Sequence, residues 1–271
     1  MARKSLARQA PIAYVRPMNS LIRAINYLRF TAFDTAGLGG SYEERERFDS
    51  AIFISPKRDF LFTKNEKCGN NTARMTLQHL AADRPLPENF RDVNRWAAPM
   101  LMPSDLGISR AEDLNTLVPF RFAIVRNPYA RLLSCYLSKF AGANPKDNLA
   151  KRLGMTMPIS FTDFALRVKD QTPPEMDPHW RVQYFNIFCD RIRYDRFVKF
   201  ETYETEFNEL MLRFFGKTGI RNVRKGAQRA ELKLADYYTP VATKAVREKY
   251  AIDFETFGYA SELPAASAAA E

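Results

Sequence analysis

Residues 122–140 read FAIVRNPYARLLSCYLSKF, and this stretch combines a strand, a turn and a helix. A predicted strand over 119–126 contains its first part and ends at Asn127-Pro128. Asn is a favoured N-cap and Pro a favoured first helical residue, so a helix is predicted over 129–140. The apolar face of that helix consists of Leu132, Leu133, Tyr136, Leu137 and Phe140.

Two more strand–helix units lie on either side of this one. A strand is predicted over 59–63, where residues 60–62 form the apolar run typical of a strand covered on both faces. It leads into a polar loop over 64–71, and a helix is predicted from about Thr72. Further along, 196–200 reads as a strand and 201–215 as a helix. This alternation predicts an α/β fold, with a central parallel sheet flanked by helices.

The remaining segments complete the organisation. Helical spacing predicts helices over 19–33 and 241–250, the charged segment 37–50 reads as a surface connection, and 84–117 reads as short helices and loops. We therefore divide the chain into an N-terminal helical extension (1–50), a single α/β domain (51–260) and a flexible tail (261–271).

Composition limits the class of protein. The chain has 271 residues, 46% of them hydrophobic, which is enough for a sizeable core. Its formal net charge of +10 favours anionic partners, and nucleic acid, anionic lipid, acidic glycans and nucleotides all fit it. Three widely spaced cysteines, Cys68, Cys135 and Cys189, form neither a disulfide framework nor a zinc site. Reduced thiols and a cytoplasmic location are therefore expected.

Membrane attachment is expected to be peripheral at most. No stretch approaches the roughly 18 consecutive apolar residues that span a bilayer. Residues 1–11 are basic but have no apolar run behind them, so they do not read as a secretory signal. The sequence thus predicts no transmembrane anchor, while the positive charge is compatible with peripheral membrane contact.

The loop before the helix at Thr72 has the composition of a phosphate-binding loop. Amides of such a loop and of a helix N-terminus converge on one anion, and a glycine lets the backbone approach it closely. A lysine adds a mobile charge. The GxxxxGK[ST] spacing is absent, so a nucleotide triphosphatase is disfavoured, although a solvated connection remains an alternative. The candidate binding residues are Lys67, Cys68, Gly69, Asn70, Asn71 and Thr72.

Arg126 and Ser134 form a second candidate anion site. Arg126 closes the strand over 119–126 with a planar donor fork that suits a phosphate, and Ser134 lies eight positions further on. Ser134 belongs to a polar stripe of the following helix, together with Arg131 and Ser138. The alternative is a structural arginine at a strand end beside solvated serines.

Four motifs together resemble the carbohydrate sulfotransferases that use 3′-phosphoadenosine 5′-phosphosulfate (PAPS), namely the membrane-associated Golgi-type group and its soluble bacterial relatives. FTKNEKCGNNT (62–72) resembles the family's 5′-phosphosulfate loop, and 122–140 resembles its 3′-phosphate segment. HWRVQ (179–183) is similar to the family's His-Trp-x-x-Gln, and DFETFGY (253–259) to its closing motif. Asn70 and Asn71 stand where the family usually carries small hydroxyl residues.

The resemblance implies a sulfotransferase-type, P-loop-like fold, and transfer of a sulfuryl group from PAPS to a carbohydrate hydroxyl. It implies that Lys67 contacts the bridging oxygen and that amides from Cys68 to Thr72 hold the 5′-phosphate. It also implies that Arg126 and Ser134 hold the 3′-phosphate. The product would be 3′-phosphoadenosine 5′-phosphate (PAP), and no metal is implied.

The acceptor hydroxyl needs a general base, and two histidines are available. His179 follows several prolines and lies in the family-like His-Trp segment, so it is the preferred candidate. His79, on the helix after the phosphate loop, is more typical of a structural residue, and Glu88 or Asp92 is an acidic alternative. The neighbouring Trp180 fits stacking on a sugar and burial in the core equally well.

Other functions compete with this hypothesis. A nucleotide kinase would need a Walker A loop and a Mg²⁺ site. A specific nucleic-acid-binding protein would need a basic face with a reader motif, whereas the basic residues are spread along the chain apart from a small cluster. That cluster could instead attract an acidic glycan. A homologue that only binds nucleotide or polyanion is disfavoured by the intact Lys67, Arg126 and Ser134. The cluster consists of Arg221, Arg224, Lys225 and Arg229.

Overall fold

A four-stranded sheet forms the centre of the molecule in the computed structural model, which describes residues 20–32, 42–82, 98–142, 145–219 and 229–264. The strand order is β1-β2-β3-β4, with β2, β3 and β4 parallel and β1 antiparallel to β2. The predicted α/β fold with a mostly parallel sheet is confirmed. The strands are β1 (Ile52–Ile54), β2 (Leu61–Thr63), β3 (Arg121–Val125) and β4 (Arg196–Lys199).

Strand β3 shows why these runs form a buried sheet. Phe122 and Ile124 pack on the face covered by α3 (Asn70–Ala81) and α9 (Tyr203–Phe215). Ala123 and Val125 point to the opposite face, and the side chains of all four are fully buried. A strand covered on both sides reads as a continuous apolar run, which is why β2 and β3 were predictable from sequence.

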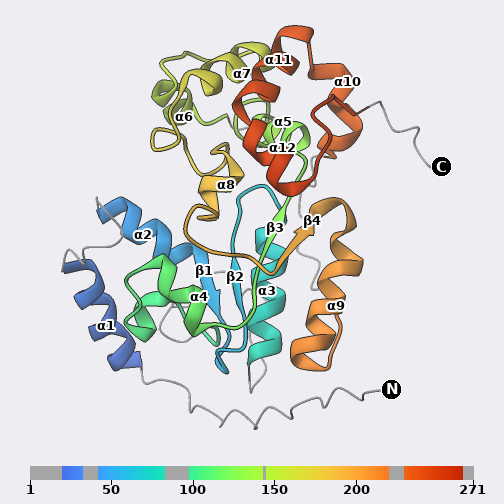
Figure 1. The fold of residues 1–271 in the computed structure, drawn as a ribbon. Coiled ribbons are helices and arrows are strands. Elements are labelled where there is room, and N and C mark those ends of the chain that lie inside the picture. Colours follow the sequence, from blue (N-terminus) through green and yellow to red (C-terminus); the bar gives the residue numbers. More distant parts are fainter. Residues whose placement is uncertain (1–19, 33–41, 83–97, 143–144, 220–228, 265–271) are drawn as a thin grey trace, which may run out of the picture.

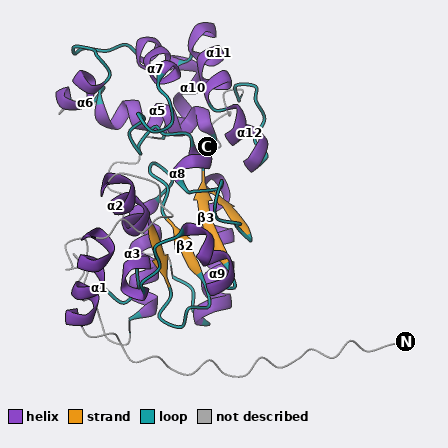
Figure 2. Cartoon of the chain, turned by 60° about the vertical axis from the view of Figure 1, so that its left-hand side comes forward, coloured by secondary structure: helices purple, strands orange, loops and turns teal. Residues whose placement is uncertain are grey.

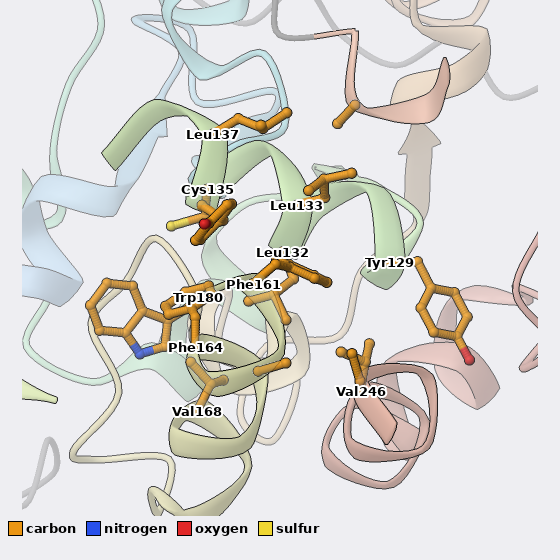
Figure 3. Close-up of a cluster of buried hydrophobic side chains, with 14 of the residues drawn as sticks. Tyr129, Leu132, Leu133, Cys135, Leu137, Phe161, Phe164, Val168, Trp180 and Val246 are labelled. Carbon is orange, nitrogen blue, oxygen red and sulfur yellow. The ribbon is translucent and has the colours of Figure 1, made fainter. Parts of the chain in front are cut away.

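A second, helical half lies beyond the carboxyl ends of the strands (Figure 1). The same arrangement is seen after rotation in Figure 2, where these helices gather beyond one end of the strands. Their buried faces form one hydrophobic cluster, in which α5, α7 and α11 meet around Leu132, Phe164 and Val246 (Figure 3). The helices are α5 (Pro128–Lys139), α6 (Asp147–Arg152), α7 (Phe161–Asp170), α10 (Leu234–Tyr237), α11 (Pro240–Lys249) and α12 (Ala251–Phe257).

The N-terminal part differs from the sequence prediction in one respect. Helix α1 (Ser20–Ala32) forms as predicted, but the expected surface connection over 37–50 is wrong for its second half, which is helix α2 (Tyr42–Ala51). Its charged residues suggested a loop, yet Phe48 is fully buried against the sheet. Strand β1 directly follows this helix, and its three residues are too few to show a period in the sequence.

Short elements connect these parts. The prediction of short helices and loops for 84–117 is confirmed where the structure describes the segment, and Glu88 and Asp92 lie outside the described residues. None of the described helices is long and apolar enough to cross a membrane. The short elements are η3 (Pro103–Leu106), η4 (Ala111–Asp113), α4 (Leu114–Leu117), α8 (Gln183–Asn186), η5 (Phe200–Thr202) and η6 (Ala230–Lys233).

Candidate active site

The parallel strands bring the predicted anion-binding segments to one edge of the sheet. Strand β2 ends at Thr63 and leads into the loop that carries Lys67, while β3 ends at Val125, directly before Arg126. Because β2 and β3 are parallel neighbours, both segments leave the sheet at the same edge, facing the helical half (Figure 1). Ligands of open α/β sheets bind at this carboxyl edge.

The loop after β2 opens directly into the N-terminus of α3. Gly69 occupies the N-cap position with a φ of 76°, and no side chain in the described residues caps the helix there. The first N–H groups of a helix have no acceptor within it, so those of Asn70, Asn71 and Thr72 can serve an anion. The side chain of Asn70 closes the loop, because its Oδ1 accepts a hydrogen bond from the backbone N of Asn65 at 2.8 Å.

Gly69 also permits a close approach between two site segments. A Cβ at this position would lie 3.1 Å from the ring of Phe200, which follows β4. The same ring lies under the Arg126 guanidinium, with Cζ 4.4 Å from the ring centroid. The Phe200 ring therefore lies between Gly69 of the loop and the Arg126 guanidinium, and the sequence did not indicate this role.

Lys67 is held in an unusual conformation and a cationic environment. Its φ of 68° lies in the left-handed region, which is uncommon for a residue other than glycine. Its Nζ donates a hydrogen bond of 2.7 Å to Ser138 Oγ on α5. Burial lowers the pKa of Lys67 to about 8, and the positive charges of Arg126 and Lys139 act in the same direction. Such a site favours a bound anion, which would offset the crowded positive charge.

Arg126 and Ser134 are both buried at this edge, each with 5% of its surface exposed. Arg126 Nη1 donates to the backbone oxygen of Lys67 at 2.9 Å, which links the two anion-binding segments. Its Nε donates to Glu231 Oε1 at 2.9 Å, and its Nη2 donates to the same carboxylate oxygen. A carboxylate thus occupies the guanidinium fork that was predicted to hold a phosphate.

Arg131 connects the Lys67 loop to the segment of His179. Its Nε donates to Glu66 O at 2.9 Å, and its Nη2 donates to Pro178 O at 3.1 Å. These carbonyls belong to the residues that precede Lys67 and His179. Only 1% of the Arg131 surface and 5% of the Ser134 surface are exposed, so these two residues of the polar stripe are buried, while Ser138 is partly buried.

His179 lies at the site edge, whereas the other candidate histidine does not. The His179 side chain is 33% exposed, and its Nδ1 lies 2.7 Å from Asp177 Oδ1. His79 is nine residues into α3, which places it about 13 Å along the helix axis from the loop. Trp180 is 1% exposed and packs against Phe164, so it is a core residue rather than a sugar platform (Figure 3).

Gln183 connects residues of all four sequence motifs at one buried point. Its Oε1 accepts from the backbone N of Arg126 at 3.0 Å and from Asn65 Nδ2 at 2.9 Å. Its backbone N donates to Asp253 Oδ2 at 2.8 Å, so the closing motif caps α8. The sequence motifs contained Gln183 and Asp253 without indicating their contacts. No sequence motif indicated that Glu231 pairs with Arg126, because the two residues are 105 positions apart in the chain.

Comparisons with known proteins match the chain to a family model and to a relative. The family model described as "Sulfotransferase family" matches residues 50–260. The protein named "Carbohydrate sulfotransferase 14" from Danio rerio is 29% identical over 160 residues, covering 52% of this chain and 44% of the zebrafish protein. The match therefore spans less than half the length of that relative. No solved structure matches the chain.

Proposed function

Because the chain belongs to the sulfotransferase family, we propose that it transfers a sulfuryl group from PAPS to a hydroxyl of a carbohydrate. The name of the zebrafish relative supports a carbohydrate acceptor. The net charge of +10 further favours an acidic one.

The observation that carries the proposal is the double attachment of Arg131. One guanidinium holds the carbonyl before Lys67 and the carbonyl before His179. A cation that can stabilise a leaving oxygen and an imidazole that can accept a proton are thereby fixed on two loops that share an anchor. Positioning of this kind supplies much of the catalysis in group transfer.

The residues at the sheet edge suit the anionic groups of PAPS, which supplies an activated sulfuryl group joined to a 5′-phosphate. The uncapped N-terminus of α3 and Lys67 would hold the 5′-phosphosulfate. Arg126 and Ser134 would hold the 3′-phosphate. The distinction from a nucleotide kinase is this second anion site, since a kinase substrate such as ATP has no 3′-phosphate.

In the proposed reaction His179 Nε2 accepts the hydroxyl proton of the acceptor as its oxygen forms a bond to sulfur. Lys67, protonated, donates a hydrogen bond to the phosphate oxygen that leaves as its bond to sulfur breaks. The negative charge that develops on that oxygen is stabilised by Lys67 and by the helix N-terminus. The proton ends on His179, and the products are PAP and the sulfated carbohydrate.

The proposal is tested by incubating the protein with PAPS and a panel of neutral and acidic glycans, and by measuring PAP and sulfated product together. We expect equal amounts of both with at least one glycan. If the protein transfers a phosphoryl group from ATP with Mg²⁺ and forms no PAP from PAPS, it is a kinase and this proposal is wrong.

The lowered pKa of Lys67 predicts the alkaline limb of the pH profile. Protonated Lys67 is the active form, so kcat/KM for PAPS should fall roughly tenfold per pH unit above about pH 8. At saturating PAPS the bound phosphates favour the charged lysine, so the fall in kcat should move to higher pH. Steady-state kinetics between pH of about 6.5 and 10 measure the alkaline fall of kcat/KM and that of kcat separately. A kcat/KM that stays flat through this alkaline range would remove Lys67 from this role.

The Glu231 carboxylate competes with a phosphate for Arg126, which predicts the effect of Glu231→Gln. The glutamine side chain has similar size but no charge, and the Glu231 side chain is 37% exposed, so the fold should tolerate it. We expect PAP to bind about 1.5- to 5-fold more tightly, the range of a partly exposed ion pair. Calorimetric titration with PAP, and with AMP as the control that lacks a 3′-phosphate, measures this. Weaker binding of PAP would show that Glu231 instead orients Arg126 for the phosphate.

A further inference from the structure

Asp177 is a buried carboxylate that faces His179 from the same loop. Its Oδ1 accepts a hydrogen bond from the His179 backbone N at 3.0 Å and lies 2.7 Å from His179 Nδ1. One oxygen therefore holds both the backbone and the ring of the histidine. Asp177 retains 7% of its surface exposure, whereas the His179 ring reaches the surface.

Asp177 is itself held in place by contacts of its backbone and side chain. Its backbone oxygen accepts hydrogen bonds from the backbone N of Trp180 at 3.0 Å and of Arg181 at 2.8 Å. Arg152 Nη1 lies 3.3 Å from the second carboxylate oxygen, Oδ2. Trp180 packs in the hydrophobic core, so this turn is anchored to the buried interior of the helical half.

The carboxyl group is ionised in this setting. Burial tends to raise the pKa of Asp177, but the hydrogen bonds from His179, the charge of the His179 ring when it is protonated and the charge of Arg152 outweigh it, so the pKa lies below its ordinary value. An ionised carboxylate can only accept hydrogen bonds. The short contact with a neutral His179 ring therefore requires the ring proton on Nδ1, which leaves Nε2 unprotonated.

We propose that Asp177 is a positioning residue, which keeps the ring proton of His179 on Nδ1 so that Nε2 can accept the proton of the acceptor hydroxyl. This inference rests on the proposed function, in which His179 is the base. Nε2 has no hydrogen-bond partner in the part of the chain that the structure describes. After the proton moves from the hydroxyl to Nε2, the imidazolium formed lies beside the Asp177 carboxylate, which stabilises its charge.

The first test needs no substrate and no change to Asp177. Nitrogen-15 NMR distinguishes the two tautomers of a neutral imidazole, and the chain has two histidines, so the His179 signals are assigned by their loss in His179→Ala. At a pH where imidazole is neutral, we expect the proton of His179 on Nδ1. A proton on Nε2 would overturn the inference.

The second test is Asp177→Asn, whose amide can donate to Nδ1 and so favours the other tautomer. We expect kcat to fall by about 10²–10⁴, in the range seen when an aspartate that orients a catalytic histidine is replaced by asparagine. The dissociation constant for PAP should change by less than about twofold, because Asp177 contributes no charge to the proposed phosphate sites. Unchanged kcat with the wild-type tautomer would overturn the inference.

The matched control is Glu175→Gln, which neutralises a carboxylate two residues away. Glu175 is exposed and bonds only to Thr172 among its described neighbours, at 2.7 Å from both the backbone N and Oγ1. Its variant should keep the wild-type tautomer and kcat within about twofold. An equal loss in both variants would point to general disturbance of the loop and contradict the specific role of Asp177.

The proposed sulfotransferase activity and the proposed role of Asp177 can be disproved independently of each other. If the wild-type protein forms no PAP with any glycan, the proposed function fails, while the tautomer in wild type and in Asp177→Asn still decides the role of the carboxylate. If the wild type is active and Asp177→Asn equals it in kcat, the proposed function stands and the role of Asp177 is wrong.

Discussion

Replacing His179 with alanine is expected to lower turnover by about 10²–10⁴, the usual effect of losing a general base. The acceptor hydroxyl then has no positioned imidazole to take its proton. PAP affinity should change by less than about twofold, because the His179 ring contacts Asp177 rather than the phosphate-binding residues. Steady-state kinetics at saturating PAPS, with calorimetric titration of PAP, measures the two effects separately.

His79→Ala is the control for this prediction. His79 lies in the last turn of α3, at the opposite end of the helix from the Lys67 loop. We expect a change in melting temperature and a kcat within about threefold of wild type. A large loss of kcat in His79→Ala, with full activity in His179→Ala, would reverse the assignment of the base.

Lys67→Ala should lower turnover by about 10²–10³, as for the loss of one donor to a developing oxyanion. The loss should appear mainly in kcat, because the leaving oxygen carries more negative charge in the transition state than in bound PAPS. The α3 N-terminus and Arg126 remain in place, so PAP should still bind. Full turnover combined with a collapse of PAP binding would show that Lys67 only holds the nucleotide.

Lys64→Ala tests whether any lysine of this loop would do. Lys64 belongs to the same loop, but its Nζ pairs with Glu66 at 3.4 Å and has no contact with Ser138. We expect its turnover to stay within about threefold of wild type, the usual result for a partly exposed ion pair near the surface. A loss equal to that of Lys67→Ala would indicate a general effect of loop charge.

The sequence predicted those parts of the fold that depend on local patterns. The strand, Asn-Pro turn and helix over 119–140 are confirmed, and Asn127 caps α5 by accepting from the backbone N of Tyr129 at 3.0 Å. The two strands that carry the candidate site were predictable for the same reason, since each is a buried apolar run followed by a helix start. Helix α2 was not predicted, because charged residues dominate its sequence and hide the apolar side that buries Phe48.

The sequence motifs named individual residues of the candidate site but not the hydrogen bonds that connect its segments. Lys67, Arg126, Ser134 and His179 were named from motifs, and their roles stay predictions. Contacts between segments far apart in the chain have no local signature, which is why the links made by Arg131 and Gln183 were missed. Glu231 is the clearest case, because nothing near it in the sequence indicates that it pairs with Arg126.

The central claim is that this sheet edge recognises the 3′-phosphate of a PAPS-type nucleotide, and calorimetric titration with PAP and AMP tests it most directly. The two ligands differ only in that phosphate. In the wild-type protein PAP should bind more tightly than AMP by about 1.5–3 kcal/mol, the contribution of a hydrogen bond to a charged group. In Arg126→Ala most of this difference should disappear while AMP binding changes little. Equal affinities of the wild type for PAP and AMP, or a preference for PAP that survives Arg126→Ala undiminished, would contradict the assignment.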